Sequence, residues 1–261
     1  MDAQPASTDP ARGANDGRAR TRISRAIFAL AACLLLVSAC DDDTPAPLPP
    51  SATPITIQTA DGISLDGRLF ASRSPHLIVF LHEYRGDQSD WYGLARSFAN
   101  GGRAATLTVD FRGYGLSEGE RTTDEMLVTD VRAAVAHGRT LGYRSIVLIG
   151  ASMGGTAAII AASADPEIEG VIALSPPARF DALDAIAAIR ERKPLFAVIA
   201  ARNDESAVDS MRMLAEAAGL IPRYRVEVGG EAHGTALLTS TAGTDVRRRI
   251  DAMLTEIWDA P

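Results

Sequence analysis

Short, nearly continuous apolar runs alternate with helical repeats through most of this chain, and the alternation limits the folds open to it. The runs occupy residues 77–81, 104–109, 146–149, 171–174, 195–200 and 224–228. Runs of this length that are apolar throughout suit strands of a parallel sheet that is buried on both faces. Two further strands, 55–59 and 64–70, flank Asp61-Gly62, a pair typical of a hairpin turn.

Apolar residues at helical spacing lie between these strands. The clearest repeats fall within residues 91–98, 127–135 and 246–257. Because helices that follow parallel strands must pack on the faces of the sheet, an antiparallel hairpin followed by strand–helix units predicts an α/β fold. We expect a mostly parallel eight-stranded sheet with helices on both faces.

The first 39 residues read as a secretory signal peptide. Five arginines precede the uncharged apolar run 26–39. As a helix of 1.5 Å rise per residue, that run would extend about 21 Å, short of the roughly 30 Å hydrocarbon core of a bilayer. A basic region, a short apolar region and small residues before a break are typical of a signal for export.

Cys40 marks the break. Val37-Ser38-Ala39-Cys40 resembles the lipobox of bacterial lipoproteins, whose cysteine is acylated and becomes the first mature residue. The alternatives are an uncleaved anchor and a plain signal peptide. Under the lipobox reading the other cysteine, Cys33, is removed with the signal, so the mature domain has neither a disulfide nor a cysteine nucleophile.

Residues 40–54 then form a proline-rich tether, because dense prolines favour an extended chain. We expect residues 55–261 to form one catalytic domain. The protein is predicted to be lipid-anchored in the bacterial envelope, facing the extracytoplasmic side. Asp41–Asp43 resemble a signal for retention at the inner membrane, but the choice between inner and outer membrane stays open, as does the oligomeric state.

Charge and motif content argue against nucleic acids and nucleotides as ligands. The net charge is −7, which argues against a nucleic-acid partner, because binding phosphates requires a basic face. Lys193 is the only lysine and no glycine-rich loop precedes it, so the chain has no P-loop for nucleotides.

One motif points to covalent chemistry. The strand at 145–149 ends in Gly150-Ala151-Ser152-Met153-Gly154, and residues 156–162 read as a helix. A G-x-S-x-G sequence on a strand–turn–helix would expose the hydroxyl of Ser152 on a strained turn, with glycines that allow close backbone approach.

From about residue 55 to 260 the chain resembles the α/β-hydrolase family. Three further segments carry the resemblance. Phe80-Leu-His-Glu-Tyr-Arg-Gly86 stands in place of the family's H-G-x-x-G oxyanion loop, Asp110–Ser117 resembles its D-x-R-G-x-G-x-S loop, and Gly230–Gly234 holds a histidine after the last strand. The resemblance implies an α/β-hydrolase fold and a Ser-Asp-His triad in that chain order. Residues 175–194 are too few for a cap domain, which relatives insert there.

The base is expected to be a histidine, since imidazole accepts a serine proton near neutral pH and returns it to a leaving group. Of four histidines, His233 is favoured because it follows a strand within a glycine-rich loop. His76 lies at the opposite end of the sheet, His137 falls within a helix, and His82 shapes its loop in the family. By resemblance the acid is Asp204, with Asp181 and Asp184 as the alternatives used by some relatives.

The resemblance also implies an oxyanion hole made by the backbone N–H groups of Met153 and Tyr84. Glu83 departs from the family, which usually has glycine there, and we expect it to alter the shape of this loop. His82-Glu83 begins like a zinc-binding H-E-x-x-H, but residue 86 is glycine, so we expect neither a metal nor another cofactor.

Two functions remain. The first is a membrane-tethered serine hydrolase that acts on a small-molecule acyl substrate, most plausibly as a carboxylesterase, with thioesters and amides left open. The second is a catalytically silent hydrolase-fold lipoprotein that binds a ligand or partner at the envelope. The complete set of Ser152, Asp204 and His233 favours the enzyme, whereas Glu83 favours the binder.

Acylation of Cys40 is testable directly. The wild-type protein should partition with membranes, and Cys40→Ser should be mislocalised or left uncleaved because the acyl acceptor is lost. Fractionation with mass spectrometry of the mature amino terminus measures both outcomes. A free thiol at Cys40 in mature protein would contradict the prediction.

Overall fold

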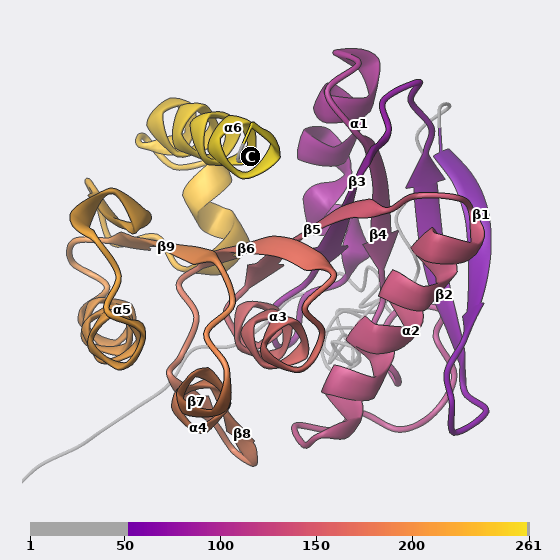
Figure 1. The fold of residues 1–261 in the computed structure, drawn as a ribbon, viewed down its shortest axis with the longest axis horizontal. Coiled ribbons are helices and arrows are strands. Elements are labelled where there is room, and N and C mark those ends of the chain that lie inside the picture. Colours follow the sequence, from indigo (N-terminus) through magenta and orange to yellow (C-terminus); the bar gives the residue numbers. More distant parts are fainter. Residues whose placement is uncertain (1–51, 260–261) are drawn as a thin grey trace, which may run out of the picture. The chain divides into compact units, whose positions relative to one another are not determined.

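The computed structural model describes residues 52–259, so the predicted signal peptide, Cys40 and most of the tether lie outside the described residues. An eight-stranded sheet runs in the order β1-β2-β4-β3-β5-β6-β9-β10 (Figure 1). Its strands are β1 (Ala52–Gln58), β2 (Ser64–Phe70), β3 (His76–Leu81), β4 (Ala105–Val109), β5 (Ser145–Ala151), β6 (Ile168–Leu174), β9 (Phe196–Ala201) and β10 (Arg225–Val228).

Pairing in the sheet is mixed, as the sequence predicts. The strand pairs β1–β2 and β2–β4 are antiparallel, and all other neighbours in this sheet are parallel. Strand β1 begins at Ala52, three residues before the predicted boundary of the domain at 55. Pro54 is accommodated opposite Arg68 because β1 is an edge strand, where a missing N–H leaves no partner unsatisfied.

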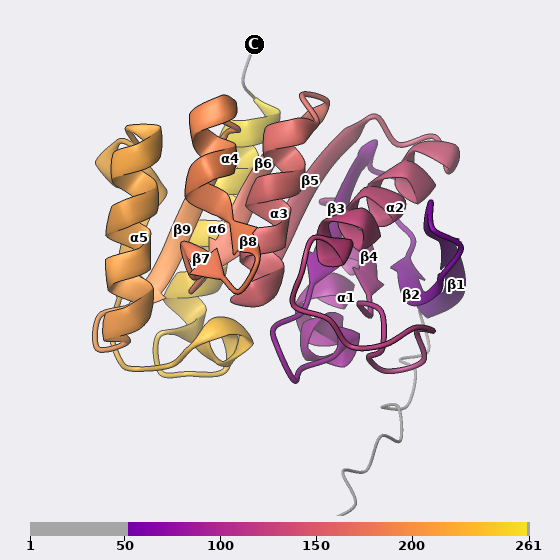
Figure 2. The same ribbon diagram turned by 90° about the horizontal axis from the view of Figure 1, so that it is seen from below.

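Helices cover both faces of the sheet. They are α1 (Tyr92–Asn100), α2 (Met126–Thr140), α3 (Met153–Ala164), α4 (Ala185–Glu191), α5 (Glu205–Ala218) and α6 (Gly243–Trp258). Figure 2 shows α2, α3, α4 and α5 on one side of the strands, with α1 and α6 on the other. In β3, Val79 joins the core beneath the first group and Ile78 joins the core beneath the second, as alternating side chains of a strand must.

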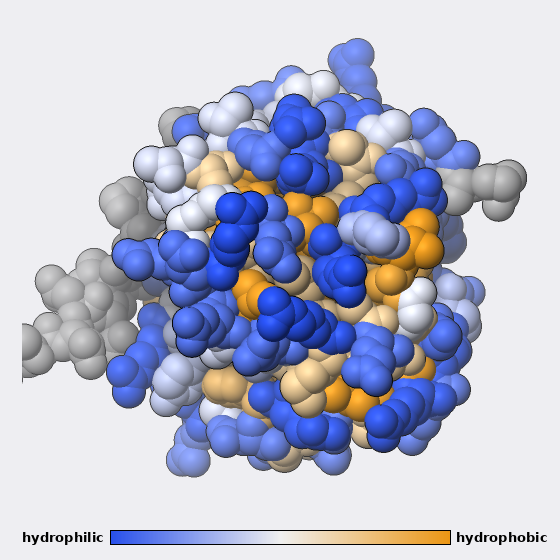
Figure 3. Space-filling model, turned by 90° about the vertical axis from the view of Figure 1, so that its left-hand side faces the viewer, coloured by the Kyte–Doolittle hydropathy of each residue, from blue (hydrophilic) through white to orange (hydrophobic). Residues whose placement is uncertain are grey.

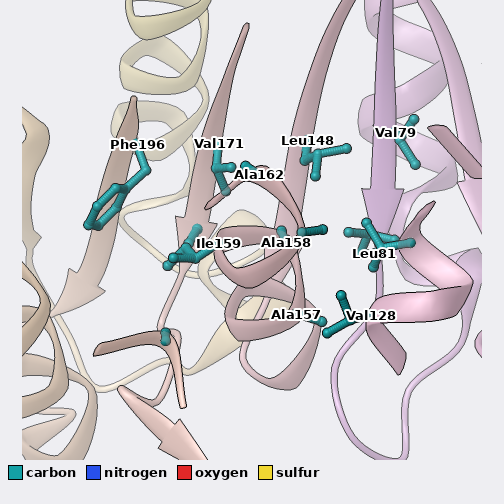
Figure 4. Packing of buried hydrophobic residues seen from close by; sticks show 14 of the residues in the cluster. Val79, Leu81, Val128, Leu148, Ala157, Ala158, Ile159, Ala162, Val171 and Phe196 are labelled. Carbon is teal, nitrogen blue, oxygen red and sulfur yellow. The ribbon is translucent and has the colours of Figure 1, made fainter. Parts of the chain in front are cut away.

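Small side chains let α3 lie close to the centre of the sheet. Ala157, Ala158 and Ala162 are fully buried. Figure 4 shows Ala158 and Ala162 toward Leu148 of β5 and neighbouring strand residues, and Ala157 beside Val128 of α2. Helix α3 is apolar on all sides because the sheet and its neighbours α2 and α4 enclose it. This packing fixes the helix that begins directly after Ser152.

Between β6 and β9 the chain forms a two-stranded hairpin, β7 (Arg179–Phe180) with β8 (Leu183–Asp184), and then α4. The sequence does not predict the hairpin, because two-residue strands are too short to show a period. This segment holds no cap domain, as the sequence predicts.

The surface is mixed in character. Figure 3, viewed from the side of α5 and β9, shows small apolar patches interrupted by hydrophilic side chains. Scattered exposed apolar residues are normal on a folded domain. Within residues 52–259, no helix combines the length and the apolar character needed to cross a bilayer.

An ion-pair network centred on the buried Arg112 braces the loop after β4. The guanidinium of Arg112 pairs with Asp130 of α2, with 2.6 Å between Nη2 and Oδ1, and with Asp61 of the β1–β2 turn, with 2.7 Å between Nη1 and Oδ2. The Arg112 side chain is 7% exposed and that of Asp130 is inaccessible to solvent. The network ties the hairpin, the loop and α2 together.

We expect Arg112→Ala to lower the free energy of unfolding by about 3–5 kcal/mol, because Asp130 would be left as an uncompensated buried charge. Urea unfolding measures the change. Arg212→Ala is the matched control, since its ion pair with Asp209 is exposed on both sides and should contribute about 0–1 kcal/mol. Equal effects of the two substitutions would contradict the prediction.

Candidate active site

Ser152 occupies a strained turn between β5 and α3. Its backbone has φ 45° and ψ −118°, outside the regions that a residue with a side chain ordinarily adopts. The turn is held from both sides, because the N–H of Ser152 donates to the carbonyl of Leu174 in β6 and its carbonyl accepts the N–H of Thr156. Such strain persists only where surrounding structure imposes it, and it is typical of functional positions.

Two glycines make this turn possible. A Cβ at Gly150 would lie 2.5 Å from the carbonyl oxygen of Gly154. A Cβ at Gly154 would lie 2.5 Å from the carbonyl oxygens of both Leu81 and His82. The first turn of α3 therefore lies directly against the end of β3, and any larger residue would force them apart.

The structure brings Ser152, His233 and Asp204 together. Nε2 of His233 lies 2.9 Å from Oγ of Ser152, and its Nδ1 lies 2.6 Å from Oδ2 of Asp204. With a neutral imidazole that donates its Nδ1–H to the carboxylate, Nε2 is free to accept the serine hydroxyl proton. These groups come from residues 152, 204 and 233, far apart in sequence.

Local structure orients Asp204. It is the N-cap of α5, and its Oδ1 accepts the N–H of Ala207 at 3.2 Å and the hydroxyl of Ser206 at 3.1 Å. The cap uses one carboxylate oxygen and turns the other toward His233. The Asp204 side chain is 9% exposed, whereas that of His233 is 45% exposed, so the imidazole is open to a ligand on one side.

The two alternative acids lie in the segment between β6 and β9. Asp184 caps α4 through the N–H of Ala187 at 2.9 Å and pairs with Arg179 at 2.8 Å. Asp181 lies in the β7–β8 turn with φ 46°. The structure therefore places Asp204 beside His233, and these contacts give Asp184 a structural role.

His82 joins two loops beside the site. Its Nδ1–H donates to the carbonyl of Glu83 at 2.7 Å, and its Nε2 accepts the N–H of Phe111 at 3.0 Å. Burial lowers the pKa of His82 to about 4, so the ring is neutral at physiological pH, as this pattern of one donor and one acceptor requires. His82 thus holds the loop after β3 to the loop after β4.

The remaining histidines lie away from Ser152. His76, at the start of β3, stacks on Trp258 with 4.3 Å between ring centroids. His137 lies in the last turn of α2.

Asp110 braces the same region from the end of β4. Its carboxylate accepts the backbone N–H of Gln88 at 2.8 Å and the side-chain amide of Gln88 at 2.8 Å. Burial raises the pKa of Asp110 to about 6. Its contacts, like those of Arg112, are with the protein scaffold.

The two expected oxyanion donors lie on the elements that the sequence predicts. Met153 is the first residue of α3, where backbone N–H groups have no partner within the helix and the helix dipole favours negative charge. Tyr84 lies in the loop after β3 and is 44% exposed. Tyr84 and Phe180 of the β7–β8 hairpin approach with 5.9 Å between ring centroids, so aromatic surface borders this loop.

Glu83 makes hydrogen bonds with Thr235 that the sequence does not predict. Its carboxylate accepts the hydroxyl of Thr235 at 2.9 Å and the N–H of Thr235 at 3.2 Å. The only signal in the sequence was a charged residue where the family has glycine.

Among the described residues, no group of three or more His, Cys, Asp or Glu side chains is arranged to hold a metal ion.

The sheet order, the strained serine between β5 and α3, and the histidine after the last strand define a class of proteins built on the α/β-hydrolase fold. The model of the alpha/beta hydrolase family matches residues 78–258. The chain belongs to that family.

Solved structures agree on the fold. An esterase from Pyrococcus furiosus is 19% identical with a TM-score of 0.68, over 82% of this chain and 95% of its own. An α/β hydrolase from Penicillium is 16% identical with a TM-score of 0.65, over 78% and 97% of the two chains. A bacterial membrane phospholipase A is 13% identical with a TM-score of 0.63, over 80% and 88%. No curated protein matches the sequence.

Proposed function

We propose that this protein is a serine hydrolase, most plausibly a carboxylesterase, that works through an acyl-enzyme on Ser152. The observation that carries the proposal is the continuous hydrogen-bonded series from Oγ of Ser152 through the His233 ring to Asp204, with 2.9 and 2.6 Å between the paired atoms. A nucleophile, a base and a group that orients the base are the parts that acyl transfer requires.

In the first half of the reaction, Oγ of Ser152 attacks the carbonyl carbon of the substrate. Nε2 of His233 takes the hydroxyl proton as the Oγ–C bond forms, and Asp204 stabilises the imidazolium. The oxyanion is stabilised by the N–H groups of Met153 and Tyr84. When the tetrahedral intermediate collapses, the C–O bond to the leaving group breaks and His233 protonates the departing alcohol.

In the second half, water attacks the acyl-enzyme. His233 accepts a proton from the water, and a second tetrahedral intermediate forms on the same oxyanion donors. Its collapse breaks the bond to Oγ, returns the proton to Ser152 and releases a carboxylic acid. The enzyme is then restored, with one ester and one water consumed.

An open site suits an esterase that discriminates only modestly among small-molecule acyl esters. The short segment between β6 and β9 leaves the site uncapped, and the loops around it would set the selectivity. Two of the structurally similar proteins are named as an esterase and a phospholipase A, which act on esters. Thioesters and amides would use the same residues.

Membrane attachment forms part of the proposal. An acyl chain on Cys40 and the proline-rich tether would hold the catalytic domain at the envelope, on the extracytoplasmic side.

Labelling by a fluorophosphonate probe tests the nucleophile. The full-length protein in detergent should be labelled covalently, and Ser152→Ala should abolish labelling because the reactive hydroxyl is removed. Ser97→Ala is the matched control, since that serine donates to a backbone carbonyl within α1 and should leave labelling unchanged. A folded wild-type protein that stays unlabelled would instead favour the silent ligand-binding lipoprotein.

Asparagine substitutions test the acid. Asp204→Asn should lower kcat for a p-nitrophenyl ester at least about hundredfold, because an amide beside Nδ1 favours the wrong tautomer of His233. Asp181→Asn and Asp184→Asn should change kcat little. Retention of full activity in Asp204→Asn, with loss in either control, would assign the acid to the segment after β6.

A further inference from the structure

Glu83 connects two loops that each carry a part of the proposed site. It lies between His82 and Tyr84 in the loop after β3. Its two carboxylate oxygens accept the hydroxyl and the backbone N–H of Thr235, at 2.9 and 3.2 Å. Thr235 is buried and follows His233 by two residues, so the contact spans 152 positions of sequence to reach the loop that carries the base.

The chain between them is shaped around the carboxylate. Gly234 has φ 55°, and a Cβ there would lie 1.5 Å from Oε2 of Glu83. The 3₁₀ helix Gly234–Leu238 begins at this point, with His233 as its N-cap. A residue with a side chain at position 234 would therefore displace Glu83. The carboxylate of Glu83 requires glycine at position 234.

We infer that Glu83 is a positioning residue that acts through His233, an inference that rests on the proposed function. By fixing Thr235, Glu83 sets where the 3₁₀ helix begins and hence where the backbone of His233 lies. The imidazole must hold its place to within a fraction of an ångström, because a displacement of about 1 Å can cost about hundredfold in rate. Because both carboxylate oxygens of Glu83 accept hydrogen bonds from Thr235, they fix the orientation of Thr235 as well as its position.

This role explains why a charged residue replaces glycine in the loop. A glycine there would leave the N–H and the hydroxyl of Thr235 without these acceptors in a buried position, and unsatisfied buried polar groups destabilise a structure. Glu83 satisfies both groups and joins the loop of the proposed oxyanion donor Tyr84 to the loop of the base.

Three variants separate positioning from charge. Glu83→Ala removes both acceptors and should lower kcat by about ten- to hundredfold with little change in KM, because the base is misplaced rather than substrate binding lost. Glu83→Gln keeps an oxygen acceptor and should restore most of the activity. Glu231→Gln, an exposed residue in the loop of His233, is the matched control and should leave kcat unchanged.

A double-mutant cycle shows whether Glu83 acts through His233. In a His233→Ala background, Glu83→Ala should cause scarcely any further loss of kcat, since residues that act as a unit are not additive. A full additional loss would place the effect on the oxyanion loop or on folding and would overturn the inference. So would an unchanged kcat in Glu83→Ala.

Hydrogen exchange gives a readout that needs no catalysis. The amide of Thr235 should exchange at least about tenfold faster in Glu83→Ala than in wild type, because its acceptor is lost. Unchanged exchange would overturn the inference. Faster exchange combined with Ser152→Ala that retains full hydrolysis would instead show that the contact is real and that the proposed function is wrong.

Discussion

The close approach of α3 to the end of β3 is the constraint on which the rest of the structure depends. Gly154 packs directly against the carbonyl groups of Leu81 and His82, so the helix that starts after Ser152 lies against the loop that carries Tyr84. Ser152, directly before this helix, has a strained backbone conformation. The alanines of α3, which bring that helix down onto the sheet, supply the packing that holds the turn in place.

The loops at this edge of the sheet are held by polar groups taken out of water. The neutral ring of His82 accepts the N–H of Phe111 in the loop after β4 and donates to the carbonyl of Glu83 in its own loop. The carboxylate of Asp110 accepts the side-chain amide of Gln88. A buried polar group is expensive unless it is paired, so each of these contacts is strongly directional. Together these contacts fix the backbone of the loops at this edge of the sheet. Exposed groups such as the imidazole of His233 therefore project from a fixed backbone.

Glu83 likewise uses paired polar groups to hold the loop that carries His233. Many departures from a family pattern signal lost function, and from sequence this one argued for a silent binding protein. The contacts of its carboxylate with Thr235 instead give it a structural role, because they tie the loop that carries Tyr84 to the loop that carries His233. The physical basis is that a carboxylate offers two acceptors in fixed geometry.

The sequence by itself determined the strands, the main helices and the turn that carries Ser152, because burial imposes periods of two and 3.6 residues and because short motifs report local turns. The expected order of a serine, an acid and a histidine came from a family resemblance. The sequence could not choose among Asp181, Asp184 and Asp204, nor find the β7–β8 hairpin or the partner of Glu83. Those were decided by the tertiary structure. An N-cap that turns one oxygen of Asp204 toward His233, and a carboxylate that meets Thr235 across 152 residues, depend on where separate chain segments meet in space, and no local period encodes such a meeting.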